Sequence, residues 1–566
     1  MLSTARIANL GDALWEATHA FPTQTAFIEA NRDRVNGVWT HGEVRAEADR
    51  LGGLLQSKGV EANDRVAILM GNQARWPISA MAAFRVGAIV MPLDYKLTPA
   101  EQLALLQHGT PKALITEQVI WRRLVEEDPT IADALIPLIP EAPDDADLKG
   151  AIRWESESTP VIPASRRRED TACIVYSSGT GGTPKGCMLS HGNYLAQAEI
   201  LGTLFPLVET DRYFSILPTN HAIDFMCGFI LPMLFGATVV HQRTLRPQFI
   251  ASTMKRQGIT HMAVVPLLLK ALGDRIREQL DALPDWQRRI ADGLISVNDN
   301  LTAKRPNQRV SSLLLKPIHE AFGGRLKQLF CGGAFVDPEL AQFFYRLGLP
   351  VAIGYGLTEA GTVVTVNDLK PFRPDTVGMP VRGTSLEIRD ADANGIGEVW
   401  IQGPTVMQGY LDAPELTAEA IVDGWLRTGD LGHFDASGHL KLVGRRSNMI
   451  VTGGGKNIYP EDVEATFDDL SDCEESCVFA TDFIWPRGSM VDETLVLVIR
   501  PQDALTKDTR TMVAERNRTL ADFKRVSHLL VWSEPFPRTA SMKVKRSELA
   551  KQIGEQCAPN ALEEAA

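Results

Sequence analysis

Short apolar runs alternate with longer amphipathic stretches through most of the chain. A short apolar run predicts a buried strand, whereas apolar positions spaced three and four apart predict a helix. Residues 74–86 have the helical spacing and lie between two apolar runs. The predicted strands are Arg65–Met70, Gly87–Pro92, Lys112–Thr116, Gly236–Val240, Ile259–Pro266, Leu326–Phe330 and Leu349–Ile353. This strand–helix–strand alternation indicates layered α/β structure with largely parallel sheets.

The pattern changes from about Ser447 onward. The strands predicted in this part are Ser476–Ala480, Glu493–Arg500 and Ser527–Trp532. Helical spacing between them predicts a small α+β domain. We therefore expect a large N-terminal α/β domain over residues 1–445 and a small C-terminal domain over residues 446–566. Within the first, residues 140–149 are polar and proline-marked and predict a loop, and residues 274–316 predict a charged, mostly helical surface excursion.

Length and composition fit a protein of more than one domain. A chain of 566 residues is longer than the chains that usually fold around a single hydrophobic core. Apolar residues make up 44%, charged residues 23% and aromatic residues 7%, which is ordinary globular usage and excludes disordered and fibrous classes. The net charge is −12 and no long basic run occurs, so nucleic acid is excluded as an expected partner.

The sequence predicts no transmembrane segment. The longest apolar stretch, residues 227–240, is shorter than the ~20 residues of a membrane span and contains Pro232 and Gly236. It predicts a buried helix that turns into a strand. The amino terminus has no apolar core of signal-peptide length, so we expect a cytoplasmic protein, with peripheral membrane contact left open. Seven scattered cysteines without a CxxC pair are expected to be free thiols.

The segment Ile174–Gly186 (IVYSSGTGGTPKG) carries the sharpest chemical signal. Glycines allow backbone N–H groups to point at an anion, and hydroxyl groups add further donors. Lys185 adds a positive charge, as a polyphosphate site requires. The P-loop pattern GxxxxGK[ST] does not fit, because proline precedes Lys185 and glycine follows it. Taken alone, the segment is equally typical of a glycine-rich surface turn.

The run Tyr176–Gly186 resembles the phosphate-binding loop of the adenylate-forming superfamily, which includes acyl-CoA synthetases, luciferases and nonribosomal adenylation domains. Further motifs follow in that family's order and spacing. They are Gly354–Ala360 (GYGLTEA), Trp425–Leu431 (WLRTGDL), Gly444–Glu464 (GRRSNMIVTGGGKNIYPEDVE) and Pro537–Arg546 (PRTASMKVKR). The resemblance covers nearly the whole chain. The insertion before the segment HEAFGGRLKQLFCGGA makes it most like bacterial long-chain fatty acyl-CoA synthetases.

The resemblance implies a nucleotide site. The loop residues that would hold the ATP phosphates are Ser177, Ser178, Gly179, Thr180, Gly181, Gly182, Thr183 and Lys185. In the next motif it implies that Tyr355 lies against adenine with Gly356 beside it, that Thr358 meets phosphate and that Glu359 holds magnesium. One carboxylate with ATP oxygens suffices for that ion. Taken singly, a glutamate after threonine is more typical of a helix start.

Two further regions are implied to complete this site. Asp430 of the TGD motif would accept hydrogen bonds from the ribose hydroxyls, and Arg445 would make a second ribose contact. The alternative for Asp430 is an ordinary turn or cap residue. Gly332, Gly333 and Ala334 resemble the family's small-residue strand end beside the adenine and acyl pocket.

Lys543 is implied to carry the chemistry, because it would bridge the acid and the α-phosphate where negative charge develops. A solvated lysine in a basic tail is the alternative. The small domain would be mobile and rotate about Arg446–Ser447, withdrawing Lys543 and presenting a thiol tunnel. The tunnel residues would include Gly454 and Lys456. Two departures leave this rotation open: Met542 stands where the family usually has glycine, and Ser447 where it usually has aspartate or lysine.

His221, in the segment PTNHA, resembles the family position that gates the acyl site and touches the acid's carboxylate. A structural histidine beside an apolar run is the alternative reading. We count His221 with Lys543, Thr358 and Glu359 as the catalytic candidates.

The implied activity is ATP- and magnesium-dependent conversion of a carboxylic acid to acyl-AMP, followed by transfer to coenzyme A. A medium- or long-chain fatty acid is the favoured substrate, because residues 226–235 are rich in bulky apolar side chains. No acidic residue stands out to recognise an amine, which disfavours amino acids. Alternatives are delivery to the phosphopantetheine of an acyl carrier protein, a luciferase-like oxygenase, and a non-catalytic relative that binds nucleotide.

Overall fold

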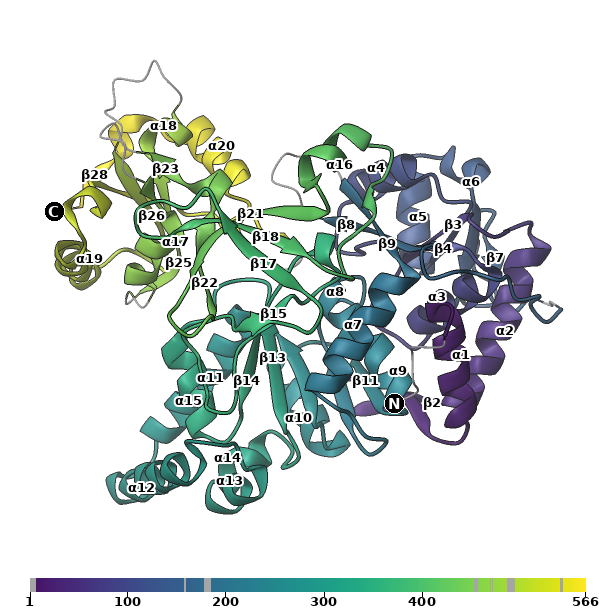
Figure 1. Cartoon of the computed structure of the whole chain (residues 1–566), viewed down its shortest axis with the longest axis horizontal. Coiled ribbons are helices and arrows are strands. Elements are labelled where there is room, and N and C mark those ends of the chain that lie inside the picture. The colour runs from purple at the N-terminus through teal and green to yellow at the C-terminus, as the bar shows by residue number, and fades with distance from the viewer. Residues whose placement is uncertain are drawn as a thin grey trace. The chain divides into compact units, whose positions relative to one another are not determined.

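The computed structural model describes residues 7–156, 159–177, 185–451, 457–468, 470, 472–485, 494–539 and 543–565. The chain divides into two compact units (Figure 1). The first holds the chain up to Leu386 together with Ile401–Leu426, and the second holds Glu387–Trp400 together with the chain from Arg427 onward. The predicted domain boundary at residues 445/446 concerns a hinge and stays a prediction.

The larger sheet of the first unit has nine strands in the described part of the chain. In spatial order they are β16 (Met379–Pro380), β15 (Thr365–Val366), β14 (Val351–Tyr355), β13 (Gln328–Gly332), β12 (His261–Val264), β10 (Arg212–Ser215), β11 (Thr238–Gln242), β1 (Thr25–Asn31) and β2 (Arg34–Thr40). The strands from β14 through β1 are mutually parallel, and the strands at the two edges are antiparallel. Parallel pairing explains the continuous apolar runs, because both faces of such strands are buried.

A second sheet of the first unit has eight described strands. In spatial order they are β19 (Gly409–Tyr410), β9 (Lys185–Ser190), β8 (Thr171–Ser177), β4 (Ile89–Pro92), β3 (Arg65–Leu69), β5 (Ala113–Thr116), β6 (Ile136–Ile139) and β7 (Ile152–Arg153). Strands β8 and β9 form an antiparallel hairpin, whereas the strands from β8 to β7 run parallel.

Helices connect and cover these strands. They are α1 (Leu10–Ala20), α2 (His41–Ser57), α3 (Arg75–Val86), α4 (Pro99–Gly109), α5 (Gln118–Glu127), α6 (Ile131–Ala134), α7 (His191–Leu204), α8 (Ala222–Phe225), α9 (Leu231–Phe235), α10 (Pro247–Gln257), α11 (Pro266–Asp281), α12 (Asp285–Thr302), α13 (Gln308–Leu314), α14 (Lys316–Ala321), α15 (Pro338–Arg346) and α16 (Pro414–Ala420). A turn of π-helix, Met226–Ile230, joins α8 to α9. No described helix has the length and apolar character that a bilayer span requires.

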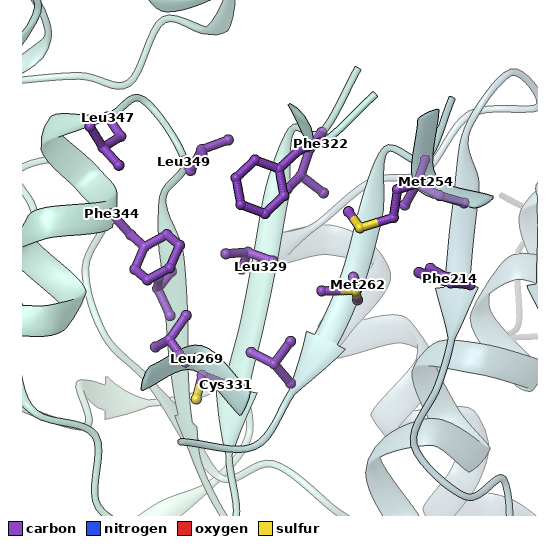
Figure 2. Packing of buried hydrophobic residues seen from close by; sticks show 14 of the residues in the cluster. Phe214, Met254, Met262, Leu269, Phe322, Leu329, Cys331, Phe344, Leu347 and Leu349 are labelled. Atoms are coloured by element: carbon purple, nitrogen blue, oxygen red, sulfur yellow. The ribbon is translucent and has the colours of Figure 1, made fainter. Parts of the chain in front are cut away.

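The core of the larger sheet is continuous from its strands into α11 and α15. Figure 2 shows Leu329 and Met262 on neighbouring strands, Phe322 next to Leu329, and Phe344 of α15 near Leu269 of α11. These side chains are almost completely buried. Burying a large apolar side chain contributes about 1.5–3 kcal/mol, so this cluster fixes the strands that end at the candidate site.

The second unit contains a four-stranded sheet in the order β25 (Cys473–Ala480), β26 (Leu495–Pro501), β27 (His528–Val531) and β28 (Glu563–Glu564). Its helices are α17 (Pro460–Glu464), α18 (Thr481–Ile484), α19 (Lys507–Thr519) and α20 (Arg546–Gln556). A five-stranded sheet contains residues of both units and consists of β17 (Ser385–Arg389), β18 (Gly397–Gln402), β21 (Trp425–Phe434), β20 (Ile421–Val422) and β22 (Leu440–Arg445). In the second unit, β23 (Ile450–Val451) pairs with β24 (Asn457–Ile458).

The predicted fold class is confirmed: a large part of layered α/β sheets precedes a small α+β part. The helical residues 74–86 form α3, and the stretch 227–240 is a buried helix that turns into β11. Residues 140–149 form no helix or strand, as predicted. All seven cysteines are free, and five of them are buried.

Candidate active site

The predicted phosphate loop joins two paired strands. Strand β8 ends at Ser177 and β9 begins at Lys185, and these two residues face each other in the antiparallel register. A P-loop instead leads from a strand into a helix, so the hairpin removes that alternative. The remaining predicted loop residues, Ser178, Gly179, Thr180, Gly181, Gly182 and Thr183, lie outside the described residues.

The small residues predicted beside the nucleotide lie at the ends of neighbouring parallel strands. Gly332 of β13 is in register with Gly354 of β14. Gly333 and Ala334 follow β13, whereas Tyr355 is the last residue of β14 and Gly356 follows it. Ligands of α/β proteins bind at such carboxyl ends.

Two of these glycines are required by close backbone approach. A Cβ on Gly356 would lie 1.9 Å from the carbonyl oxygen of Thr362, and a Cβ on Gly332 would lie 2.8 Å from that of Gly354. Both distances are far below van der Waals contact, so a larger residue would displace the strand ends. Gly332 and Gly356 are therefore needed for the backbone conformation at these two strand ends.

Glu359 is held from two sides. Its backbone lies in the short 3₁₀ helix Thr358–Ala360, where its carbonyl accepts a hydrogen bond from Met407 N–H at 2.8 Å. Its side-chain Oε1 accepts a hydrogen bond from the hydroxyl of Tyr410 at 3.2 Å. Tyr410 was not predicted from the sequence, although it fixes the carboxylate predicted to hold magnesium.

Tyr410 also contacts the predicted phosphate lysine. The Lys185 Nζ lies 5.5 Å from the centre of the Tyr410 ring, in the range of a cation–π interaction. Strand β19, which contains Tyr410, pairs with β9 through Tyr410 and Cys187. Burial and the negative charge of Glu359 raise the pKa of Tyr410, which keeps its hydroxyl protonated as a hydrogen-bond donor.

The residues present fit a magnesium ion that is shared with a nucleotide. No group of three or more His, Cys, Asp or Glu side chains in the described chain could enclose a metal ion by itself. Magnesium is usually held by one or two carboxylates together with phosphate oxygens and water. Glu359 supplies one carboxylate close to the cationic Lys185, as that arrangement requires.

His221 faces a buried carboxylate that was not predicted as a site residue. Its Nε2 lies 3.6 Å from Oδ2 of Asp94, which follows β4 and is almost fully buried. Burial alone would raise the pKa of Asp94, but interactions with His221 and with the backbone N–H and the charge of Lys96 hold it below its usual value. The ring of His221 thus has an ionised partner on one side.

Asp224, one turn after His221, is completely buried in α8. Three hydroxyl groups donate hydrogen bonds to it, from Tyr213 at 3.0 Å, Ser215 at 2.7 Å and Thr219 at 3.2 Å. Burial raises the pKa of Asp224 to about 7 despite these donors. Its side chain is therefore held by three neighbouring side chains and has no exposed surface.

In the second unit, the two predicted ribose contacts are adjacent. Asp430 of β21 and Arg445 of β22 are directly opposite in the antiparallel register. Arg445 Nε donates to Asp430 Oδ1 at 2.8 Å. Asp430 is mostly buried, whereas the side chain of Arg445 is about half-exposed.

Glu398 anchors the chain around these two residues. It is almost fully buried and accepts hydrogen bonds from Arg446 at 2.9 Å and from Arg427 at 3.4 Å. The N–H of Gly429 adds a third contact at 3.3 Å. Glu398 thus ties the TGD turn to the predicted hinge residue Arg446, and sequence reasoning missed it.

Lys543 is exposed, and its backbone is fixed by Thr539. Lys543 N–H donates to Thr539 Oγ1 at 3.1 Å, and Thr539 N–H donates to the Lys543 carbonyl at 2.8 Å. At the base of this turn, Arg538 forms an ion pair with Glu475 at 2.6 Å. Met542, Gly454 and Lys456 lie outside the described residues.

The structure therefore brings some predicted residues together in the first unit and assigns others to the second. Lys185 and Glu359 meet at Tyr410 in the first compact unit. Asp430, Arg445 and Lys543 belong to the second unit.

Comparisons with known proteins show the family to which this chain belongs. The family model described as "AMP-binding enzyme" matches residues 14–411. A long-chain-fatty-acid–CoA ligase of Mycobacterium bovis is 30% identical over 456 residues, covering 76% of this chain and 74% of the relative. A feruloyl-CoA synthase of Amycolatopsis is 27% identical over 523 residues, covering 91% and 94%.

A solved structure supports the fold. The O-succinylbenzoate coenzyme A synthetase of Bacillus subtilis, in complex with AMP, superimposes with a TM-score of 0.75 and 22% identity, covering 96% of this chain and 98% of that one.

Proposed function

Because this chain belongs to the AMP-binding enzyme family and is an AMP-forming acid–thiol ligase, we propose that it converts a medium- or long-chain fatty acid to its coenzyme A thioester. The meeting of Lys185 and Glu359 at Tyr410 supports the nucleotide-binding part of this proposal. A cation and a carboxylate fixed by one aromatic side chain suit a magnesium-bound polyphosphate. ATP, magnesium and coenzyme A are the co-substrates and cofactor it requires.

The first half-reaction joins the acid to AMP. A carboxylate oxygen attacks the α-phosphorus of ATP, the bond to the bridging oxygen breaks, and pyrophosphate leaves. Lys543 stabilises the charge that develops on the phosphoryl oxygens, and Lys185 binds the departing phosphates. Magnesium, held by Glu359, supplies charge neutralisation when it is bound.

The second half-reaction forms the thioester. The sulfur of coenzyme A attacks the acyl carbon, the carbon–oxygen bond to AMP breaks, and the thiol proton passes to solvent. Asp430 and Arg445 hold the ribose of AMP through both steps in this proposal. Between the two steps, rotation about Arg446–Ser447 would withdraw Lys543 from the active site and bring in the residues of the thiol tunnel.

An aliphatic acid is supported by the segment that follows His221. Phe225, Phe229 and Met233 are buried there. The one carboxylate of this segment, Asp224, is completely buried and hydrogen-bonded by three hydroxyls, so it offers no partner to a substrate ammonium group. His221, which lies 3.6 Å from Asp94, contacts the carboxylate of the incoming acid in this proposal. The Mycobacterium bovis relative is named for long-chain fatty acids.

An aromatic acid is the second candidate, because the Amycolatopsis relative that covers 91% of the chain is named for feruloyl-CoA. A carrier-protein phosphopantetheine is the alternative acceptor. The expected cytoplasmic location stays a prediction.

Pyrophosphate release across fatty, aromatic and amino acids, with and without coenzyme A, tests the proposal. We expect release with fatty acids, stimulated by coenzyme A, with acyl-CoA as the product. Pyrophosphate release with aromatic acids alone would mean that the substrate is an aromatic acid and not a fatty acid. Pyrophosphate release that does not change with coenzyme A would favour a carrier protein as the acyl acceptor. No pyrophosphate release with any acid would contradict the proposed function.

A further inference from the structure

Helix α12 carries a row of exposed apolar side chains. Trp286, Ile290, Val297 and Leu301 are 64%, 54%, 47% and 65% exposed. With 3.6 residues per turn they lie within about 60° of one another around the helix axis. Large apolar side chains gathered in one exposed row differ from singly scattered ones, which need no explanation.

The opposite face of α12 attaches it to the core. Ile295, Asn298 and Thr302 are buried, and Asn298 Nδ2 donates to the carbonyl of Arg346 at 2.9 Å. Asp299 adds an ion pair with Arg346 at 3.1 Å. The helix is therefore fixed on α15, and its apolar row faces outward (Figure 1 places α12 at the margin of the first unit).

Charge is distributed unevenly around this row. The three carboxylates of α12, at Asp285, Asp292 and Asp299, lie roughly 130–170° away from the centre of the row. Arg289 borders it instead. The segment that follows, residues 303–316, contains four Lys or Arg and no Asp or Glu, although the whole chain has a net charge of −12.

The same combination continues on α13. Leu313 is 79% exposed, and Arg309, one turn before it, is also exposed. Thus a second short helix adds an apolar side chain and a cation without any carboxylate.

We propose that this surface, formed by Trp286, Ile290, Val297, Leu301 and the cations that border and follow them, docks onto the surface of an anionic lipid bilayer. Helix α12 lies parallel to the membrane plane, and its apolar row enters the boundary between headgroups and acyl chains. Tryptophan is favoured at that depth. Arg289, Lys304 and Arg305 contact anionic headgroups, while the carboxylates of the helix face away.

The charge pattern disfavours a second copy of the chain as the occupant. Two rows placed face to face would bring the bordering cations of both copies together without carboxylates to pair with them. An anionic bilayer pairs with every one of these cations. The inference goes beyond the proposed function, because it needs neither ATP nor an acid.

Sedimentation with vesicles tests the proposal. The full chain is mixed with vesicles of phosphatidylcholine alone or of phosphatidylcholine with phosphatidylglycerol, at low and high salt. We expect binding to the anionic vesicles, weakened by salt, and little binding to the neutral ones. The double variant Trp286→Ser, Leu301→Ser should lose binding by about tenfold or more.

A matched control replaces two other exposed apolar residues, Leu204→Ser and Val208→Ser, which are 48% and 51% exposed. This variant should bind vesicles as the wild type does, and both variants should keep the wild-type melting temperature. The proposal is overturned if the wild type stays in the supernatant, or if both double variants bind equally. The proposal is also overturned if sedimentation velocity shows that the wild type is a dimer and that the α12 variant is a monomer. The occupant of this surface would then be a second copy of the chain.

Discussion

The hydroxyl of Tyr410 donates a hydrogen bond to Oε1 of Glu359 across 3.2 Å, while the ring of the same tyrosine lies 5.5 Å from the Lys185 ammonium. One side chain thus positions the proposed magnesium ligand and the proposed phosphate ligand. The two contacts can be separated by substitution, because phenylalanine keeps the ring and loses only the hydroxyl.

For Tyr410→Phe we expect the magnesium concentration at half-saturation to rise about tenfold, since hydrogen bonds to charged groups contribute about 1.5–3 kcal/mol. Titration calorimetry of ATP at several magnesium concentrations measures this without any turnover. Binding of ATP in EDTA should change little. Tyr345→Phe, which removes a hydroxyl that donates to the Thr302 carbonyl, is the control. An unchanged magnesium dependence in Tyr410→Phe would contradict the role assigned to this hydroxyl.

Lys543→Ala should reduce adenylate formation by about 10²–10³-fold, the usual effect of removing one group that stabilises transition-state charge. Thioester formation from supplied acyl-AMP should be largely kept. The two half-reactions are measured separately by pyrophosphate release and by acyl-CoA production. Lys545→Ala removes a nearby lysine that pairs with Glu548 at 3.2 Å and should affect neither. Equal losses in both half-reactions of Lys543→Ala would count against the proposed division of labour.

Asp430→Asn should weaken ATP binding by about tenfold, because an amide oxygen accepts hydrogen bonds less strongly than a carboxylate does. The rate at saturating ATP should change little. Glu387→Gln breaks another ion pair in the same sheet, with Arg389 at 2.8 Å, and serves as the control. Initial rates over a range of ATP concentrations decide the matter; an unaltered ATP requirement in Asp430→Asn removes this residue from the ribose site.

Asp224→Asn should change how stability depends on pH. The pKa of Asp224 is raised to about 7 in the folded chain, whereas an unfolded aspartate titrates near pH 4. The stability from its protonated form is fully present below about pH 4 and is lost as the pH rises to about 7. Asparagine never ionises. The free energy of unfolding of Asp224→Asn, relative to that of the wild type, should therefore increase by on the order of 2–3 kcal/mol from pH 5 to pH 8.

Denaturant unfolding of both proteins at the two pH values gives this difference directly. Other titrating groups cancel, because both proteins contain them. A gap between variant and wild type that stays constant with pH would mean that Asp224 is ionised throughout.

Burial explains which elements could be predicted. Residues 65–70 were expected as a strand, and β3 spans Arg65–Leu69, because a strand covered on both faces needs a continuous apolar run. The prediction for residues 236–240 began and ended two residues early. Strand β11 continues through His241 and Gln242, which are buried although they are polar. His241 stacks on Phe27 with ring centres 5.6 Å apart, a contact that no local pattern indicates.

The candidate site divides in the same way. Asp430 and Arg445 were expected to act together from motif resemblance, and the structure places them in register. Tyr410 and Glu398 were missed because each acts on residues about fifty positions away, Glu359 and Arg446. A tyrosine after glycine carries no local mark of such a contact. The roles of His221, Lys543 and the residues of the phosphate loop stay predictions.

The close approach at Gly356 has a consequence for sequence variation. A Cβ there would lie 1.9 Å from a backbone oxygen, a distance that no rotamer change can relieve, because the obstacle is main chain and not a flexible side chain. Every codon change that alters the amino acid at this position should therefore damage the fold of the site. In a library of random variants selected for activity, glycine should be recovered at residue 356 almost without exception, whatever acid the library is selected on.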